Sequence, residues 1–136
     1  MVLRLVGALC ALLAQGDFAA IEGAVVSRAP VALFVYNRPG HTRQTVEALA
    51  ANTLAGETPL FIFSDAPRND AARRQVEEVR SYIRTITGFQ SITIIERPTN
   101  LGLARSIIDG VTGLCEKYGR VIVVEDDLVT SSRFLS

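Results

Sequence analysis

The stretch Val121-Ile122-Val123-Val124-Glu125-Asp126-Asp127 decides how the rest of the chain can be interpreted. Its apolar, β-branched residues do not alternate with polar ones, which predicts a strand that is buried on both faces. Three acids follow where the strand ends, and ligands bind at this carboxyl edge of an open α/β sheet. Adjacent carboxylates repel one another, so they favour a hard divalent cation with oxygen ligands at this point. The alternative is a strand that runs into a solvated acidic loop.

Three earlier segments show the same pattern of an apolar run that ends in polar residues. The runs at residues 31–36, 60–63 and 91–97 predict three further strands. Between the four strands, apolar residues at spacings of three and four predict helices. We expect their inward faces to consist of Thr42, Val46, Leu49 and Thr53 in the first helix, Ala72, Val76, Val79, Ile83 and Ile86 in the second, and Leu103, Ile107, Val111, Leu114 and Tyr118 in the third.

The helix boundaries are predicted from capping residues. Asn37, which a proline follows two residues later, suits the start of the first helix. Residues 67–70 mark a turn and the start of the second helix. Gly88 and Gly119 suit the ends of the second and third helices. Residues 131–132 are serines that suit the cap of another helix near the end of the chain.

Four strands that alternate with three helices predict an α/β fold, a Rossmann-like three-layer sandwich with a mainly parallel sheet. No Gly-x-Gly-x-x-Gly motif follows the first strand, so a dinucleotide site of the usual kind is not expected. A Walker A motif is also absent from the sequence, which excludes a P-loop NTPase. The polar residues at the four strand ends converge on one edge: Asn37 and Arg38, Ser64 and Asp65, Arg97 with Asn100, and Glu125 to Asp127.

Length and composition indicate one globular domain. The chain has 136 residues, of which 49% are hydrophobic and 21% are charged. Its formal net charge of zero argues against bulk attraction to nucleic acid or to an anionic membrane. Cys10 and Cys115 lack the spacing of a metal site or a disulfide framework, so we expect reduced thiols and a cytoplasmic protein.

The two ends of the chain are interpreted separately from the domain at residues 30–136. Residues 1–29 form an N-terminal extension, in which Met1 to Ala14 is apolar apart from Arg4. This segment is too short to span a bilayer. The alternatives are a signal-peptide core, a short helix packed on the domain, or a segment unrelated to the fold. The chain stops nine residues after Asp127, so we expect the sheet to be truncated after its fourth strand.

Four short motifs at successive strand ends give the region from about Ala29 to Ser136 a family resemblance. It resembles the nucleotide-sugar half of GT-A-type glycosyltransferases, in particular the N-acetylglucosaminyltransferase I-like enzymes, whose metal motif is also Glu-Asp-Asp, and the bacterial family 2 enzymes. The matching pieces are Tyr36-Asn37-Arg38-Pro39, Ser64-Asp65, Arg97-x-x-Asn100-x-Gly102-x-x-Arg105 and Val-Val-Glu125-Asp126-Asp127.

The resemblance implies a role for each acid at the strand ends. Asp127 resembles the acid that ligates a Mn²⁺ or Mg²⁺ ion, which in turn holds the diphosphate of the donor. Glu125 and Asp126 resemble the residues that contact the ribose or support the metal from behind. Asp65 resembles the acid that accepts the imide N–H of uracil, which favours a UDP-sugar. If strand geometry continues, Asp126 and Asp127 point to opposite sides, so only one of them needs to contact the metal.

The other matching positions also receive nucleotide-binding roles from the resemblance. Tyr36 and Arg38 resemble the residues near the base and phosphates. Asn100 and Arg105 lie on the loop that closes over the nucleotide in this family.

Each position also has a structural alternative. Arg38 could lie on the surface beside a helix start, and Asp65 could stabilise the turn that follows it. Asn100 is a good helix cap, and Arg105 could pair with Asp109 four residues later. His41 has no second His or Cys nearby in the sequence, so it is interpreted as a helix-surface residue.

The expected function is therefore an inverting, metal-dependent transfer of a hexosyl or N-acetylhexosaminyl group. The expected partners are a nucleotide-sugar donor and a hydroxyl acceptor, such as a glycan or a lipid-linked molecule. Peripheral membrane association is an open alternative, and binding to nucleic acid is not expected. The general base of the family lies beyond the position equivalent to Ser136, so no catalytic residue is named. The alternatives are a fragment that binds nucleotide without turnover and a nucleotidyltransferase with a similar sheet. A receiver-like signalling domain is disfavoured, because the first strand ends in Asn37-Arg38 and the only lysine, Lys117, lies near a helix end.

Overall fold

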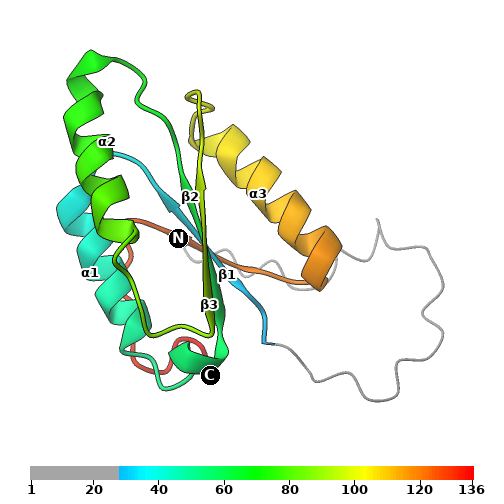
Figure 1. The fold of residues 1–136 in the computed structure, drawn as a ribbon. Coiled ribbons are helices and arrows are strands. Elements are labelled where there is room, and N and C mark those ends of the chain that lie inside the picture. The colour runs from blue at the N-terminus through cyan, green and yellow to red at the C-terminus, as the bar shows by residue number, and fades with distance from the viewer. Residues whose placement is uncertain (1–27) are drawn as a thin grey trace.

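The sheet of the computed structural model, which describes residues 28–136, has four parallel strands (Figure 1). They are β1 (Val31–Val35), β2 (Pro59–Ser64), β3 (Ser91–Glu96) and β4 (Ile122–Glu125), in the order β3-β2-β1-β4. The predicted N-terminal extension lies outside the described residues, apart from its last two positions. Arg28, one of these two, forms an ion pair of 2.8 Å with Glu57.

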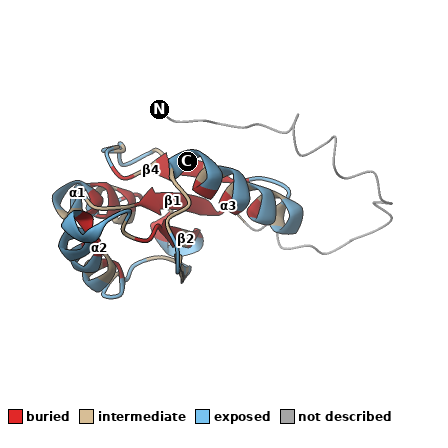
Figure 2. Ribbon diagram, turned by 90° about the horizontal axis from the view of Figure 1, so that it is seen from above, coloured by how far each residue is buried: buried red, intermediate tan, exposed pale blue. Residues whose placement is uncertain are grey.

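Helices cover both faces of the sheet, which confirms the predicted three-layer α/β fold. Helices α1 (Pro39–Ala50) and α2 (Asp70–Ile83) lie on one face, and α3 (Leu103–Tyr118) lies on the other, as the view from above shows (Figure 2). A single 3₁₀ turn, η1 (Ala55–Glu57), precedes β2. Within residues 28–136, no helix combines the length and the apolar character that crossing a membrane would require.

The alternation of side chains along each strand divides the core in two. The core on the α1–α2 side is built from Val31, Leu33, Val35, Val46, Leu49, Leu60, Ile62, Val79, Ile83, Val124 and Leu135. The core on the α3 side is built from Ala32, Phe34, Phe63, Leu114, Val121 and Val123. Cys115 packs half-buried against this second core.

The start of α1 differs from the prediction by one residue. Its N-cap is Arg38 rather than Asn37, and the cap residue's side chain makes no capping hydrogen bond. Pro39 occupies the first turn, where its missing N–H costs no intrahelical bond. Thr42, Val46 and Leu49 face inward as predicted, together with Thr45. The prediction for Thr53 was wrong, because α1 ends at Ala50 and the residue is exposed beyond it.

Helix α2 begins where it was predicted and ends earlier. Asn69 is its N-cap, and the side chain of Asn69 accepts a 3.0 Å hydrogen bond from the backbone N–H of Ala72. The helix ends at Ile83, so Gly88 is not its cap; Gly88 lies in the following loop with φ of 95°. Ile86 follows the helix and still packs, half-buried, against the core.

The predicted inner face of α3 is confirmed except at its first residue. Leu114 is buried, and Ile107, Val111 and Tyr118 pack half-buried against the core. The prediction for Leu103 was wrong, because it is 56% exposed; Ser106 and Gly110 are buried in addition. The N-cap is Gly102, with φ of 77°, so Asn100 does not cap this helix. Gly119 ends the helix in the left-handed conformation, as predicted.

The segment after β4 turns back toward the end of α1. The backbone N–H of Leu135 donates a 3.1 Å hydrogen bond to Oδ1 of Asn52, and that of Thr53 donates to Ser132 O at 3.4 Å. Leu135 is buried in the core on the α1–α2 side. The residues after Ser131 form a turn rather than the predicted helix start.

Candidate functional site

A small cleft lies at the carboxyl edge of the sheet, where the polar strand ends were expected to meet. Its volume is about 190 Å³, below the ~300–1,000 Å³ of most small-molecule sites. It can therefore enclose only part of a ligand as large as a nucleotide. The lining consists of Phe34, Val35, Tyr36, Asn37, Arg38, Phe63, Asp65, Arg68, Asn100, Gly102, Leu103, Ser106, Glu125 and Asp126.

Asp65, which follows β2, is the most fully bonded side chain of the cleft. Its Oδ1 accepts the backbone N–H groups of Ala66 and Leu101, both at 2.9 Å. Its Oδ2 accepts the backbone N–H of Gly102 at 2.9 Å and Nδ2 of Asn100 at 3.1 Å. A carboxylate has about four lone-pair sites, so these four donors leave none for a ligand. Asp65 thus joins β2 to the start of α3, rather than stabilising the turn that follows it.

Asn100 lies two residues before Gly102, the N-cap of α3, and its side chain bonds elsewhere. Its Nδ2 donates to Oδ2 of Asp65 and, at 2.7 Å, to Ala66 O. Asp65 also accepts the N–H of Gly102 itself, which fixes the position of the residue from which α3 begins. The loop between β3 and α3 is therefore held against the end of β2.

Arg80 of α2 is a residue of this region that the sequence interpretation missed. Its side chain is only 12% exposed. One guanidinium nitrogen donates to the carbonyl oxygens of Asp65 and Arg97 at 3.3 and 2.9 Å. Its Nε donates to Oγ of Ser64 at 3.2 Å. Because the face carrying Arg80 is otherwise charged and solvated, the sequence pattern hides the fact that Arg80 ties together the ends of β2 and β3.

The acids after β4 are paired with Arg38, the N-cap residue of α1. One guanidinium nitrogen of Arg38 donates to Oδ1 of Asp126, and the other lies 3.6 Å from Oδ2 of Asp127. The side chain of Asp126 is 5% exposed and that of Asp127 is 43% exposed. Burial raises the pKa of Asp126, and the charge of Arg38 opposes this shift. Strand geometry ends at Glu125, and both acids approach the same guanidinium, so the prediction that they point to opposite sides was wrong; they differ in burial instead. Arg38 itself lines the cleft.

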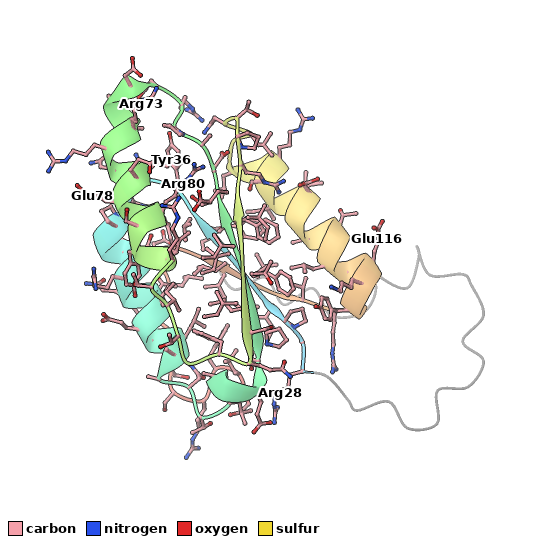
Figure 3. All side chains as sticks on the ribbon, in the orientation of Figure 1. Arg28, Tyr36, Arg73, Glu78, Arg80 and Glu116 are labelled. Carbon is pink, nitrogen blue, oxygen red and sulfur yellow. The ribbon has the colours of Figure 1, made fainter. Side chains whose placement is uncertain are left out.

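Tyr36 and Glu125 contribute the ends of β1 and β4. The hydroxyl of Tyr36 accepts a 2.9 Å bond from the backbone N–H of Arg68. Tyr36 and Arg80 lie toward the carboxyl end of the sheet, whereas Arg28 and Glu116 lie toward the opposite end (Figure 3). Glu125 pairs in register with Phe34 of β1 and lines the cleft.

Arg105 and Asp127 are the two predicted site residues that do not line the cleft. Asp127 comes directly after the last lining residue and lies near Arg38. Arg105 lies on α3, where it is exposed. Nor does it pair with Asp109, because Oδ2 of Asp109 forms an ion pair of 2.6 Å with Arg97. The helical spacing that suggested this pair was correct, but the end of β3 supplies a closer cation.

Two stacked phenylalanines form one wall of the cleft. Phe34 and Phe63 are neighbours in the β1–β2 register, and their rings stack with centroids 4.9 Å apart. Gly110 of α3 lies against them, and a Cβ built at Gly110 would lie 2.9 Å from Phe63 Cζ and 3.0 Å from Phe34 Cζ. A single glycine on the sheet-facing side of a helix is the signal that could have pointed to this close approach.

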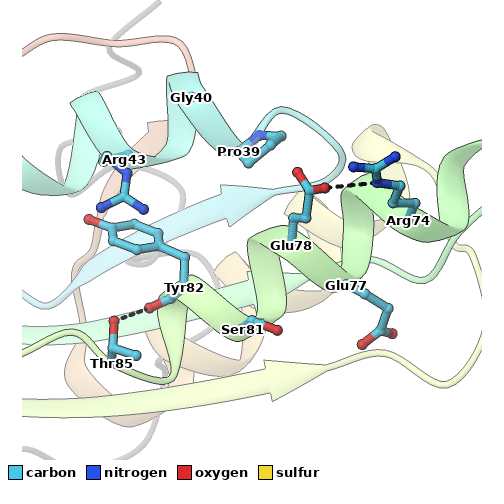
Figure 4. Close-up of a pocket in the computed structure, with 9 residues that line it drawn as sticks. All are labelled: Pro39, Gly40, Arg43, Arg74, Glu77, Glu78, Ser81, Tyr82 and Thr85. Carbon is cyan, nitrogen blue, oxygen red and sulfur yellow. Dashed lines mark hydrogen bonds and ion pairs between the residues drawn. The ribbon is translucent and has the colours of Figure 1, made fainter.

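A larger hollow of about 720 Å³ lies elsewhere, as an open groove between α1 and α2 (Figure 4). Its residues include Arg43, which lies over the ring of Tyr82 at 4.3 Å from the centroid, and Arg74, which pairs with Glu78 at 3.1 Å. These long, mixed charges are typical of a solvated helix surface. The groove is lined by residues of α1, of α2 and of the turn after α2, and none of the polar residues that follow the strands lies in it. We therefore take the smaller cleft as the candidate site.

A divalent cation fits the acidic stretch only if a ligand completes its coordination. In residues 28–136, no group of three or more His, Cys, Asp or Glu side chains has the arrangement of a metal site. Asp126 is buried and hydrogen-bonded to Arg38, whereas Asp127 is half-exposed, and its Oδ2 lies 3.6 Å from Arg38. Mg²⁺ is commonly held by one or two carboxylates together with substrate phosphates. Asp127 suits that kind of site.

Comparison with known proteins adds no family to this description. No family model matches the chain, and no curated protein matches it in sequence.

Proposed function

We propose that this chain is the donor-binding half of a metal-dependent glycosyltransferase that uses a nucleoside-diphosphate sugar. The main support is the meeting of Arg38, Asp126 and Asp127 beside a cleft at the carboxyl edge of a parallel sheet. Ligands of open α/β sheets bind at this edge. A cation next to acids there suits a ligand that carries both phosphate and metal.

In the proposed arrangement the nucleoside occupies the cleft and the diphosphate lies at its mouth. Tyr36, Asn100 and the phenylalanine wall would contact the nucleoside, and Arg38 would contact the phosphates. Glu125 and Asp126 would support the ribose side, with Asp127 as the protein's ligand to Mn²⁺ or Mg²⁺. When bound, such an ion neutralises the charge that develops on the leaving diphosphate.

The hydrogen bonds of Asp65 bear on which base the nucleotide carries. The expected contact between Asp65 and a uracil imide would require one of its four present donors to leave. We therefore assign Asp65 to holding the cleft together and keep UDP as the first nucleotide to test. The compartment we propose is the cytoplasm, with membrane association where the acceptor is lipid-linked.

The nucleotidyltransferase alternative receives less support from the loop after β1. Such an enzyme usually has a glycine-rich, basic loop there, whereas here only three residues separate β1 from Pro39, the first residue of α1.

Calorimetric titration of UDP into the full chain, with and without Mn²⁺, tests the proposal. Asp127→Asn removes one charge at the site with little change in size, and Glu116→Gln does the same at an exposed position at the far end of α3. We expect Mn²⁺-dependent binding in the wild type and in Glu116→Gln, and a loss of more than about tenfold in Asp127→Asn. Equal affinities in the two variants, or no binding to the folded wild type, would refute the proposal.

A further inference from the structure

We infer that Arg38 makes the site selective for a metal–diphosphate complex over either component alone; this inference rests on the proposed function. Its guanidinium has one anchored nitrogen, which donates to Oδ1 of the buried Asp126. The other nitrogen lies 3.6 Å from Oδ2 of the half-exposed Asp127. The two ends of one fork therefore have partners of very different burial.

The anchored end of the fork is expected to stay in place when a ligand binds. Asp126 is 5% exposed, and removing its cation would leave a buried charge without compensation. Asp127 is 43% exposed, so water can replace Arg38 around it at little cost. Arg38 itself is 45% exposed, which leaves the nitrogen near Asp127 accessible to a ligand. Only this second nitrogen is then available for exchange.

The charges at the mouth oppose each component of the ligand in a different way. The acids attract a free divalent cation, but Arg38, 3.6 Å from the Asp127 oxygen that the metal needs, repels it and weakens that attraction. A free diphosphate meets the carboxylates of residues 125–127, which oppose the attraction that Arg38 and Arg68 of the cleft exert on it. Each component alone therefore meets one repulsion that the other component would remove.

The complex removes both repulsions at once. Its metal ion would bind the carboxylate of Asp127, while a phosphate oxygen would accept a hydrogen bond from the nitrogen of Arg38 that now lies near Asp127. Arginine is suited to this exchange because its planar fork can hold a carboxylate and a phosphate at the same time, which the single ammonium of a lysine cannot. Metal and diphosphate should consequently bind with strong positive coupling, and the coupling should depend on Arg38.

The test measures binding of Mn²⁺ alone, UDP alone and the two together to the full chain. The signal of free Mn²⁺ in electron paramagnetic resonance reports metal binding without any need for turnover. The variants are Arg38→Gln, which removes the charge, Arg38→Lys, which keeps the charge without the fork, and Arg74→Gln as a control at an exposed arginine of α2. Because Arg38→Gln leaves Asp126 unpaired and could fail to fold, the double variant Arg38→Gln with Asp126→Asn removes both charges of the pair.

We expect Arg38→Gln to bind Mn²⁺ alone about tenfold more tightly than the wild type and the complex about tenfold more weakly. The double variant loses one positive and one negative charge, so its affinity for Mn²⁺ alone should stay close to that of the wild type while its affinity for the complex falls about tenfold. In Arg38→Lys, Mn²⁺ alone should bind as weakly as in the wild type while the complex weakens. Arg74→Gln should match the wild type in every titration. Equal affinity for Mn²⁺ alone in the wild type and in folded Arg38→Gln, or an undiminished affinity of the double variant for the complex, would overturn the inference and leave the proposed function standing. Tighter Mn²⁺ binding in Arg38→Gln, with no UDP binding to any folded protein, would instead refute the proposed function and the selectivity with it.

Discussion

Replacing Gly110 with alanine should destabilise the protein through the phenylalanine wall of the cleft. The new methyl carbon would lie 2.9 Å from Phe63 Cζ and 3.0 Å from Phe34 Cζ. Carbon atoms in contact normally stay about 3.5–4.0 Å apart, so the rings or the helix must move by roughly half an ångström or more. Both rings are buried, at 3% and 6% exposure, and stacked on each other, which leaves them little room.

The magnitude follows from two opposing effects. Overpacking of a well-packed core costs about 1–3 kcal/mol. Alanine in a helix interior gains about 1 kcal/mol over glycine, so the net loss should be about 0–2 kcal/mol. Gly113 offers a matched control, because it lies in the interior of the same helix and a Cβ there meets no atom within 4 Å. Gly113→Ala should therefore stabilise the protein by about 1 kcal/mol.

The difference between the two variants isolates the packing effect, since the gain in helix propensity is common to both. We expect Gly110→Ala to be less stable than Gly113→Ala by about 1–3 kcal/mol, measured by urea unfolding with circular dichroism. The slope of the free energy of unfolding against urea should stay constant, so that the midpoints can be compared. Equal midpoints would mean that α3 does not approach the two rings as closely as described. Since Phe34 and Phe63 line the cleft, Gly110→Ala should also weaken nucleotide binding, whereas Gly113→Ala should not.

Four other substitutions test contacts at the strand ends and between α1 and α2. Asp65→Asn replaces one acceptor oxygen with an amide donor that would face existing donors, so it should lower the free energy of unfolding by about 2–3 kcal/mol in urea titrations. An unchanged midpoint would contradict the four-bond arrangement. Arg80→Met should lower the free energy of unfolding by about 2–3 kcal/mol in thermal unfolding, because it leaves buried carbonyl groups without a donor. Arg84→Met, which breaks an exposed ion pair, should lower it by only about 0–1 kcal/mol. Similar losses in the two variants would mean that Arg80 does not hold the strand ends together. Burial raises the pKa of the Tyr82 phenol above its ordinary value and Arg43 opposes the shift, so the native state holds this proton more tightly than the unfolded state. Stability should fall as pH rises above about 10 through the raised pKa, and Arg43→Gln should move the ionisation of Tyr82, followed by ultraviolet absorbance, to still higher pH; a shift to lower pH would contradict the stacked arrangement.

The elements of the fold could be predicted because their signals are local. The apolar run at residues 121–124 and its three counterparts became strands, and the spacing of Val76, Val79 and Ile83 gave the inner face of α2. Errors arose where a distant residue competes with a local signal. Asn100 looks like a helix cap in isolation, but its side chain donates to Asp65, 35 residues earlier, and α3 begins two residues later at Gly102.

Residues of the candidate site were predictable in part, for a related reason. A polar residue directly after a buried strand must lie at the sheet edge, which placed Tyr36, Asp65 and Glu125 at the cleft. Arg105 is one turn into a helix, and its direction depends on how that helix is rotated against the sheet. Gly110 of α3 lies against the two stacked phenylalanines. The glycine indicates a close approach, but its partners come from β1 and β2, so the helix sequence alone does not identify the contact.

The sequence by itself determined the alternation of strands and helices, the parallel sheet that this alternation requires, and the meeting of the strand ends at one edge. Periodicity and strand connection are properties of neighbouring residues, so they can be read before the chain folds. Tertiary structure alone decided which charges neutralise one another. Arg38 and Asp126 are 88 residues apart, and their pairing exists only because β1 and β4 lie side by side in the sheet. That pairing buries one acid and leaves Asp127 exposed, which is the asymmetry on which both the proposed metal site and its selectivity depend.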